Sequence, residues 1–292
     1  MERDVSAYIE LLRPQQYTKN LFIFLPLFFG FRITETEPLG AALVAFVAFS
    51  LVASAIYIFN DYRDREDDRR HPEKCRRPLA SGRVTTGTAL VLAVGLLLLG
   101  GALMALVSFD GLGLLATYVV LNGAYTLGLK QVAIVDITFI AIGFVIRLMV
   151  GAVVTGVALS EWIIVMTFLL ALFLSLAKRR DDVIIHLTSN EKMRKAVDGY
   201  NLAFLDSAMV MTAAIVVLAY VLWSLTDEVA ARMGEQVYLT SVFVVLGVLR
   251  YMQIALVEEK SGNPSRVLLR DRFLQGVLVA WLGAFVWLLY LR

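Results

Sequence analysis

Residues 39–59, LGAALVAFVAFSLVASAIYIF, carry no charged side chain and decide the fold class. A helix of this length spans a hydrocarbon core of about 30 Å. Residues 84–109 form a second uncharged run. The chain of 292 residues is 59% hydrophobic, and its mean hydropathy is +0.74. We therefore predict an all-α, polytopic helical bundle in a membrane.

The pattern of apolar runs predicts about nine transmembrane helices. A short interfacial helix that breaks near Pro14 precedes them. Because no stretch long enough for a soluble domain interrupts the spans, residues 1–292 are predicted to form a single transmembrane domain. The only cysteine, Cys75, excludes an internal disulfide and a CxxC metal site. The predicted spans are 17–33, 39–60, 85–108, 111–129, 133–156, 160–178, 205–226, 237–257 and 273–291.

The distribution of charge predicts the orientation of the chain. One set of alternate loops, dominated by 60–84 and 178–204, is rich in lysine and arginine. The opposite set is mostly acidic, with Arg232 and Arg292 as its bases. Since cytoplasmic loops carry the excess of basic residues, the N-terminus and both large charged loops are expected in the cytosol, and the C-terminus outside.

Between the first two uncharged runs lies the charged stretch 60–82, NDYRDREDDRRHPEKCRRPLASG. If the preceding helix continues past the membrane, Asp61, Asp64 and Asp68 fall at i, i+3 and i+7 and share one face. Magnesium prefers oxygen ligands and is often held by one or two carboxylates together with substrate phosphates. The three aspartates are therefore candidate metal ligands and catalytic residues. The alternative is a solvated helix end with local salt bridges.

The second half of the stretch supplies Lys74, Arg76 and Arg77. Arginine forks suit phosphate oxygens, so this run is a candidate diphosphate site. A positive-inside membrane anchor is the simpler interpretation, and both can hold together.

These residues resemble a known family. The motif NDYRDREDD followed by RHPEKCRRPLASG resembles the first aspartate-rich motif of the UbiA superfamily of intramembrane prenyltransferases, and nine spans fit that fold. Within the superfamily, the chain is most similar to the decaprenyl-phosphate phosphoribosyltransferase branch. Four more stretches carry this resemblance: LLRPQQYTKN (11–20), YTLGLK (125–130), GFVIRLMVGA (143–152) and GNPSRVLLRDRFLQ (262–275).

The chain departs from the superfamily pattern at the second acidic motif, and this difference indicates which substrate it binds. Enzymes that use prenyl diphosphates carry a second DxxxD motif after the sixth span. Here that position reads KRRDDVIIH (178–186), and residues 185 and 186 are isoleucine and histidine. The second acidic motif is absent and Lys178, Arg179 and Arg180 stand beside Asp181 and Asp182. This pattern fits a protein that binds two phosphorylated substrates, one with magnesium and one through basic side chains.

Charged residues inside the predicted spans complete the candidate site. Arg147 lies in mid-span, where an arginine is costly and normally faces a cavity or a partner. Asp136 lies three turns before it on the same face. A structural network between helices is the alternative to a polar funnel for anionic substrate. The full set of predicted substrate-binding residues is Asn60, Lys19, Lys74, Arg76, Arg77, Tyr125, Lys130, Arg147, Lys178 and Arg179.

The resemblance implies a Mg²⁺-dependent phosphoribosyltransferase of a bacterial or archaeal cytoplasmic membrane. It implies transfer of 5-phosphoribose from phosphoribosyl diphosphate to a polyprenyl phosphate, for synthesis of cell-envelope glycan precursors. Two alternatives remain at this stage: a prenyltransferase acting on an aromatic or other acceptor, and a lipid or ion transporter. Nucleic acid is not an expected partner, and the sequence is compatible with a homo-oligomer.

Overall fold

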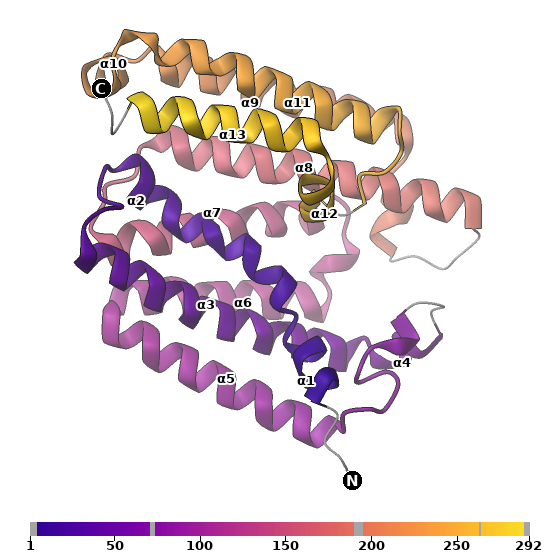
Figure 1. Ribbon diagram of the computed structural model, residues 1–292. Coiled ribbons are helices and arrows are strands. Elements are labelled where there is room, and N and C mark those ends of the chain that lie inside the picture. The colour runs from indigo at the N-terminus through magenta and orange to yellow at the C-terminus, as the bar shows by residue number, and fades with distance from the viewer. Residues whose placement is uncertain (1–4, 71–73, 190–194, 263, 289–292) are drawn as a thin grey trace. The chain divides into compact units, whose positions relative to one another are not determined.

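The computed structural model of the chain describes residues 5–70, 74–189, 195–262 and 264–288 (Figure 1). Across these ranges the chain forms helices and no strand, which confirms the predicted all-α class. The chain divides into two compact units. Unit 1 is Met1–Gly128 with Ile146–Leu159, and unit 2 is Leu129–Val145 with Ser160–Arg292. The single-domain organisation stays a prediction.

Unit 1 is built around α3, which packs along α5, α6 and η1 (Figure 1). Small residues allow the close approach of α3 and α5. A Cβ added at Gly100 on α5 would stand 2.7 Å from the carbonyl oxygen of Ala48 on α3, and small residues at such contacts are typical of membrane helices. The elements of this unit are α1 (Val5–Leu12), η1 (Pro14–Phe24), α2 (Leu25–Phe29), α3 (Thr36–Arg63), α4 (Arg65–Arg70), η2 (Lys74–Arg76), α5 (Thr86–Val107), α6 (Phe109–Leu127) and the second part of α7 (Val135–Thr155).

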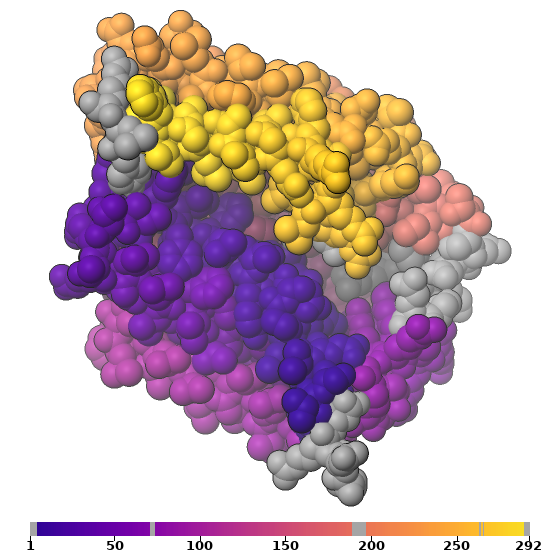
Figure 2. Space-filling view, viewed as in Figure 1, coloured from indigo at the N-terminus to yellow at the C-terminus, as the bar shows by residue number. Residues whose placement is uncertain are grey.

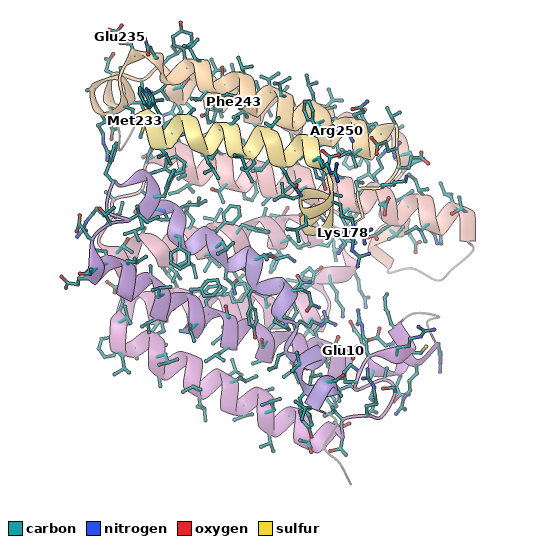
Figure 3. The ribbon with its side chains drawn as sticks, viewed as in Figure 1. Glu10, Lys178, Met233, Glu235, Phe243 and Arg250 are labelled. Carbon is teal, nitrogen blue, oxygen red and sulfur yellow. The ribbon has the colours of Figure 1, made fainter. Side chains whose placement is uncertain are left out.

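Unit 2 packs α8 on α9, and α11 on α9 and α13. Figure 2 shows the yellow α13 lying along the orange helices of its own unit. Arg250 of α11, labelled in Figure 3, binds Asp271 at the start of α13 at 2.6 Å. The elements are η3 (Leu129–Gln131), the first part of α7, α8 (Glu161–Ser189), η4 (Lys195–Gly199), α9 (Leu202–Ser224), α10 (Asp227–Met233), η5 (Glu235–Thr240), α11 (Ser241–Leu256), α12 (Pro264–Arg270) and α13 (Arg272–Val286).

The predicted count of nine spans is not confirmed. Within the described residues, six helical segments are long and apolar enough to cross a membrane. The predicted fourth and ninth spans correspond to α6 and to the shorter apolar α13. The polytopic membrane architecture itself is confirmed. The six segments are Thr36–Arg63, Thr86–Val107, Val135–Thr155, Glu161–Thr188, Leu202–Ser224 and Glu235–Leu256.

The first predicted span, 17–33, differs from expectation in its geometry. It consists of a 3₁₀-helix, η1, followed by the five-residue α-helix α2. Prolines at 14 and 26 stand at the starts of these two elements, and proline lacks the N–H that a continuous helix needs. The predicted short helix before it is α1, and it ends before Pro14 as expected.

Two helix ends explain where the boundaries fall. Ser108 separates α5 from α6 in an extended conformation, and its Oγ accepts a hydrogen bond from the N–H of Gly111 at 3.0 Å. This N-cap lies at the boundary between the predicted spans 85–108 and 111–129. The prediction that the charged loop begins at residue 178 is wrong, since α8 continues to Ser189. Residues 178–182 therefore lie on a helix.

Candidate active site

The acidic motif lies at the junction of α3 and α4. The α-helix ends at Arg63, and Asp64 adopts φ −89° and ψ 1° before α4 begins at Arg65. Helical hydrogen bonds nevertheless cross the junction, from the N–H of Asp64 to the oxygen of Asn60 at 2.9 Å and from the N–H of Asp68 to the oxygen of Asp64 at 2.8 Å. The helical spacing is therefore largely kept.

Asp61 and Asp68 are both buried and share one arginine. Nη1 of Arg77 lies 3.1 Å from Oδ1 of Asp61 and 2.7 Å from Oδ2 of Asp68. Arg13, between α1 and η1, adds a second contact to Oδ1 of Asp61 at 2.5 Å. The structure thus brings together two of the three predicted aspartates with one predicted phosphate-binding arginine. Arg13 is not among the substrate-binding residues predicted from the sequence.

The donor chemistry of this pair fits a divalent cation. Two buried carboxylates face one positive centre, here the Arg77 guanidinium, and oxygen donors are those that magnesium prefers. Among the residues that the structure describes, no group of three or more His, Cys, Asp or Glu side chains lies close enough to hold a metal ion. Of the three predicted ligands, the structure brings Asp61 and Asp68 together, and the metal role of all three aspartates stays a prediction.

Further ion pairs lie within the charged stretch and directly after it. Arg65 and Arg69 bind Glu66, and the hydrogen bond from Arg65 lowers the pKa of Glu66. Arg83 binds Glu10 of α1 at 2.5 Å and the carbonyl oxygen of Arg76 at 2.7 Å. This is the local salt-bridge network that the simpler interpretation expected. His71 lies outside the described residues.

In unit 2, the predicted basic cluster is paired with carboxylates. Nε of Arg179 lies 2.5 Å from Oδ2 of Asp136, which is fully buried, and Nη1 of Arg179 binds Asp182. The hydroxyl of Tyr200 donates to Oδ1 of Asp136 at 2.7 Å and accepts from the N–H of Ile134 at 2.6 Å. The pKa of the Tyr200 hydroxyl is raised, mainly by burial and to a smaller extent by the hydrogen bond to Asp136.

The neighbouring Arg180 holds three elements of unit 2 together. Its guanidinium binds Asp206 of α9 at 2.7 Å and the carbonyl oxygen of Ala255 on α11 at 2.8 Å. Glu259 lies 3.8 Å away. Of the three basic residues at 178–180, only Lys178, labelled in Figure 3, has an exposed side chain. No pattern in the sequence pointed to Tyr200 or to the pairing of Arg180 with Asp206.

Asp181, the next residue on α8, faces the loop after α11. The backbone of Ser261 hydrogen-bonds its carboxylate, and a Cβ added at Gly262 would stand 2.2 Å from Oδ2 of Asp181. A side chain at position 262 would therefore require the Asp181 carboxylate to shift. The hydroxyl of Ser261 also binds the carbonyl oxygen of Ala177 at 2.9 Å, which ties the loop to α8.

Arg147 is buried in unit 1 in a network of polar and aromatic partners. Its Nε donates to Asn20 at 2.8 Å and its Nη2 donates to the Tyr118 hydroxyl at 2.9 Å. Its guanidinium lies 4.8 Å from the ring centres of both Phe49 and Tyr118. These contacts are those of the structural network that the sequence left open, and a substrate role for Arg147 stays a prediction.

The other predicted substrate residues are distributed over both units. In unit 1, Lys19, Asn60, Lys74 and Tyr125 are half-buried and Arg76 is exposed. In unit 2, Lys130 is buried in η3. Their predicted roles in substrate binding remain predictions.

Comparison with known proteins decides the family. The UbiA prenyltransferase family matches residues 22–275 of the chain. The chain belongs to the UbiA prenyltransferase family. A decaprenyl-phosphate phosphoribosyltransferase of Corynebacterium glutamicum is 33% identical over 98% of this UbiA chain and 87% of its own length. One of Mycobacterium tuberculosis is 32% identical over 96% of the chain and 93% of its own length.

Solved structures confirm the fold. A UbiA homologue of Archaeoglobus fulgidus bound to DMAPP and Mg²⁺ aligns with a TM-score of 0.73, at 20% identity, over 97% of this UbiA chain and 99% of its own. A digeranylgeranylglyceryl phosphate synthase structure aligns with a TM-score of 0.67 at 19% identity, covering 98% of each chain. Both predictions, of UbiA family membership and of an integral membrane protein, are therefore confirmed.

Proposed function

We propose that this protein transfers 5-phosphoribose from phosphoribosyl diphosphate to a polyprenyl phosphate and releases diphosphate. The observation that carries the proposal is the identity of 32–33%, over nearly the full chain, to proteins named decaprenyl-phosphate phosphoribosyltransferase. The absence of a second DxxxD motif at 178–186 supports the same choice, since it separates this chain from the prenyl-diphosphate pattern.

The donor diphosphate is assigned to unit 1. Asp61 and Asp68, with Asp64 as a third candidate, would hold Mg²⁺, which neutralises the charge that develops on the leaving diphosphate. Lys74, Arg76 and Arg77 supply positive charge for the same phosphate oxygens. A UbiA homologue bound to Mg²⁺ supports a divalent cation in this family.

To attack ribose C1, the acceptor phosphate needs basic side chains that bind and orient it, and it does not need a general base. A phosphate monoester has a second pKa near about 6, so its oxygen is already ionised at neutral pH. The reaction breaks the bond from ribose C1 to the diphosphate oxygen and forms a bond from C1 to the lipid phosphate oxygen, with no net proton transfer. Lys178 offers an exposed positive charge. We assign Arg179 a positioning role, because its guanidinium binds Asp136 and Asp182.

The orientation of the chain follows from its charge. The Lys/Arg excess in the loops around 60–84 and 178–204 supports a cytosolic N-terminus and a cytosolic active site. The water-soluble donor then arrives from the cytosol, and the polyprenyl phosphate from the bilayer. The downstream use would be a ribosylated precursor of an envelope glycan.

A second candidate function is prenyl transfer from a prenyl diphosphate to an aromatic or other acceptor. The family description and the DMAPP-bound homologue favour it. The missing second DxxxD motif favours phosphoribosyl transfer.

One experiment separates the two candidates. Purified protein with Mg²⁺ receives labelled phosphoribosyl diphosphate and polyprenyl phosphate, and a parallel sample receives labelled prenyl diphosphate and aromatic acceptors. We expect label in the lipid product of the first sample alone. Product in the second sample alone would overturn the proposal. A chelator should abolish transfer, and added Mg²⁺ should restore it.

Asp64→Ala is expected to abolish turnover while the protein stays inserted in the membrane and folded. Its matched control is Asp67→Ala, an exposed aspartate on α4, which should keep near-normal activity. Near-normal activity in Asp64→Ala would reject its role in metal binding.

A further inference from the structure

The two buried aspartates of unit 1 are neutralised by arginines that reach them from different segments. The side chains of Asp61 and Asp68 are 2% and 7% exposed, whereas those of Arg13 and Arg77 are 19% and 28% exposed. The carboxylates are therefore fixed in the interior, and the guanidinium groups reach them from the side of the solvent.

Neighbouring buried carboxylates need a compensating cation, because an unpaired buried charge is very unfavourable. Nη1 of Arg77 contacts one oxygen of each carboxylate, so it neutralises both. A divalent cation between the same two carboxylates would satisfy the same need. The arginine and the metal therefore require the same oxygen atoms.

We propose that Arg77 and Arg13 are resident counter-cations of Asp61 and Asp68, and that a divalent cation and Arg77 compete for these two carboxylates. When the metal binds, the Arg77 guanidinium turns from the aspartates to the diphosphate oxygens. The inference rests on the metal role proposed above and is independent of which group is transferred.

Arg13 has a second partner besides Asp61. Its guanidinium lies 5.4 Å from the ring centre of Tyr57, and cation–π contact does not require Asp61. Its backbone is left-handed, with φ 54°, at the joint between α1 and η1. Such a conformation is unfavourable for a residue with a Cβ.

This competition makes a prediction about binding order. Metal alone must displace an arginine and therefore binds weakly. The donor diphosphate accepts the displaced arginine, so the metal and the diphosphate should each raise the affinity for the other by the same factor. An arginine that only binds substrate would not affect the metal alone.

The test measures Mg²⁺ or Mn²⁺ affinity of the full-length protein by titration calorimetry without donor. Arg77→Gln should bind the metal at least about tenfold more tightly than the wild type, and should bind inorganic diphosphate more weakly in the presence of metal. The matched control is Arg69→Gln, which removes the same charge from the same stretch but pairs with Glu66. Its metal affinity should change less than about twofold.

Thermal unfolding with and without metal covers the case in which Arg77→Gln is unstable. Metal should then raise the melting temperature of Arg77→Gln more than that of the wild type, because it replaces the lost counter-cation. Equal or weaker metal binding, and an equal or smaller thermal shift in Arg77→Gln, would overturn the inference. Tighter metal binding without any phosphoribosyl transfer by the wild type would overturn the proposed reaction and leave this inference standing.

Discussion

The charged cluster of unit 1 and that of unit 2 use the same residue types in opposite arrangements. In unit 1, two aspartates share Arg77, which follows η2, and Asp61 also binds Arg13 from the joint between α1 and η1. In unit 2, two aspartates share Arg179, whose side chain is only 4% exposed. The side chains of Arg13 and Arg77 are partly exposed, so water can replace a lost partner, whereas Arg179 and Asp136 are both enclosed. We therefore infer that a metal ion can replace an arginine in the cluster of unit 1, whereas the cluster of unit 2 stabilises the fold.

The strongest test of this difference is Asp136→Asn in unit 2. This change removes the charge of the fully buried partner of Arg179, and breaking a buried pair costs about 3–5 kcal/mol. The expected result is a large fall in the free energy of unfolding in detergent, measured by thermal or denaturant unfolding. In Asp136→Asn/Arg179→Gln the loss should be smaller than the sum of the single losses. A loss of unfolding free energy below about 1 kcal/mol would contradict the stabilising role of the buried Asp136–Arg179 pair.

In unit 1, Asp61→Asn should act on activity more than on stability. Loss of charge stabilisation at a transition state commonly lowers turnover by about 10²–10³-fold. The free energy of unfolding should change by less than about 1 kcal/mol, because Arg13 and Arg77 can turn toward water. The transfer assay and the unfolding curve, measured on one preparation, check both parts. If Asp61→Asn were fully active but strongly destabilised, the cluster of unit 1 would have a structural role and the contrast with unit 2 would be wrong.

Tyr200→Phe tests the support behind Arg179. It removes the hydrogen bond to Asp136 and the acceptor of the Ile134 N–H, and bonds to charged groups contribute about 1.5–3 kcal/mol. The pKa of Tyr200 is raised by burial, so its contribution is present below its unfolded pKa of about 10 and is lost only as pH rises above that value. The stability difference from the wild type should therefore be constant from about pH 6 to 9. Tyr238→Phe, at an exposed position, is the control.

The smallest effect is expected for Asp206→Asn. Asp206 is 41% exposed where it meets Arg180, and pairs open to solvent contribute about 0–1 kcal/mol. Arg180 also keeps its bond to the carbonyl oxygen of Ala255. Unfolding measurements should detect little change, and a loss comparable to that of Asp136→Asn would show that exposure does not distinguish these pairs.

The parts of the fold that depend on local sequence were predictable. Uncharged runs marked the membrane helices, and Pro14 marked the end of α1. The 3₁₀ geometry of η1 was not predictable, because hydropathy carries no information on the bonds of Asn20 to Ser50 and to Arg147 that hold it. The extension of α8 was also missed, since its last turns are charged and end the apolar run.

The candidate site was predictable to the extent that its chemistry lies within one stretch of sequence. Helical spacing brought Asp61 and Asp68 together, and the Arg/Lys run supplied Arg77. Pairings over long separations were not predictable. Arg13 reaches Asp61 from 48 residues away, and Asp136 binds Arg179 from 43 residues away. Consequently the cluster at 178–182 was expected to be basic, although carboxylates neutralise its two buried arginines.

The most direct test of this account is the initial rate of label transfer from phosphoribosyl diphosphate to polyprenyl phosphate by wild type, Asp68→Asn and Asp206→Asn with Mg²⁺. Each variant removes one carboxylate that binds an arginine. We predict transfer by the wild type, a loss of at least about 100-fold in Asp68→Asn and a change of less than about threefold in Asp206→Asn. No transfer by the wild type, or equal rates in the two variants, would contradict the account.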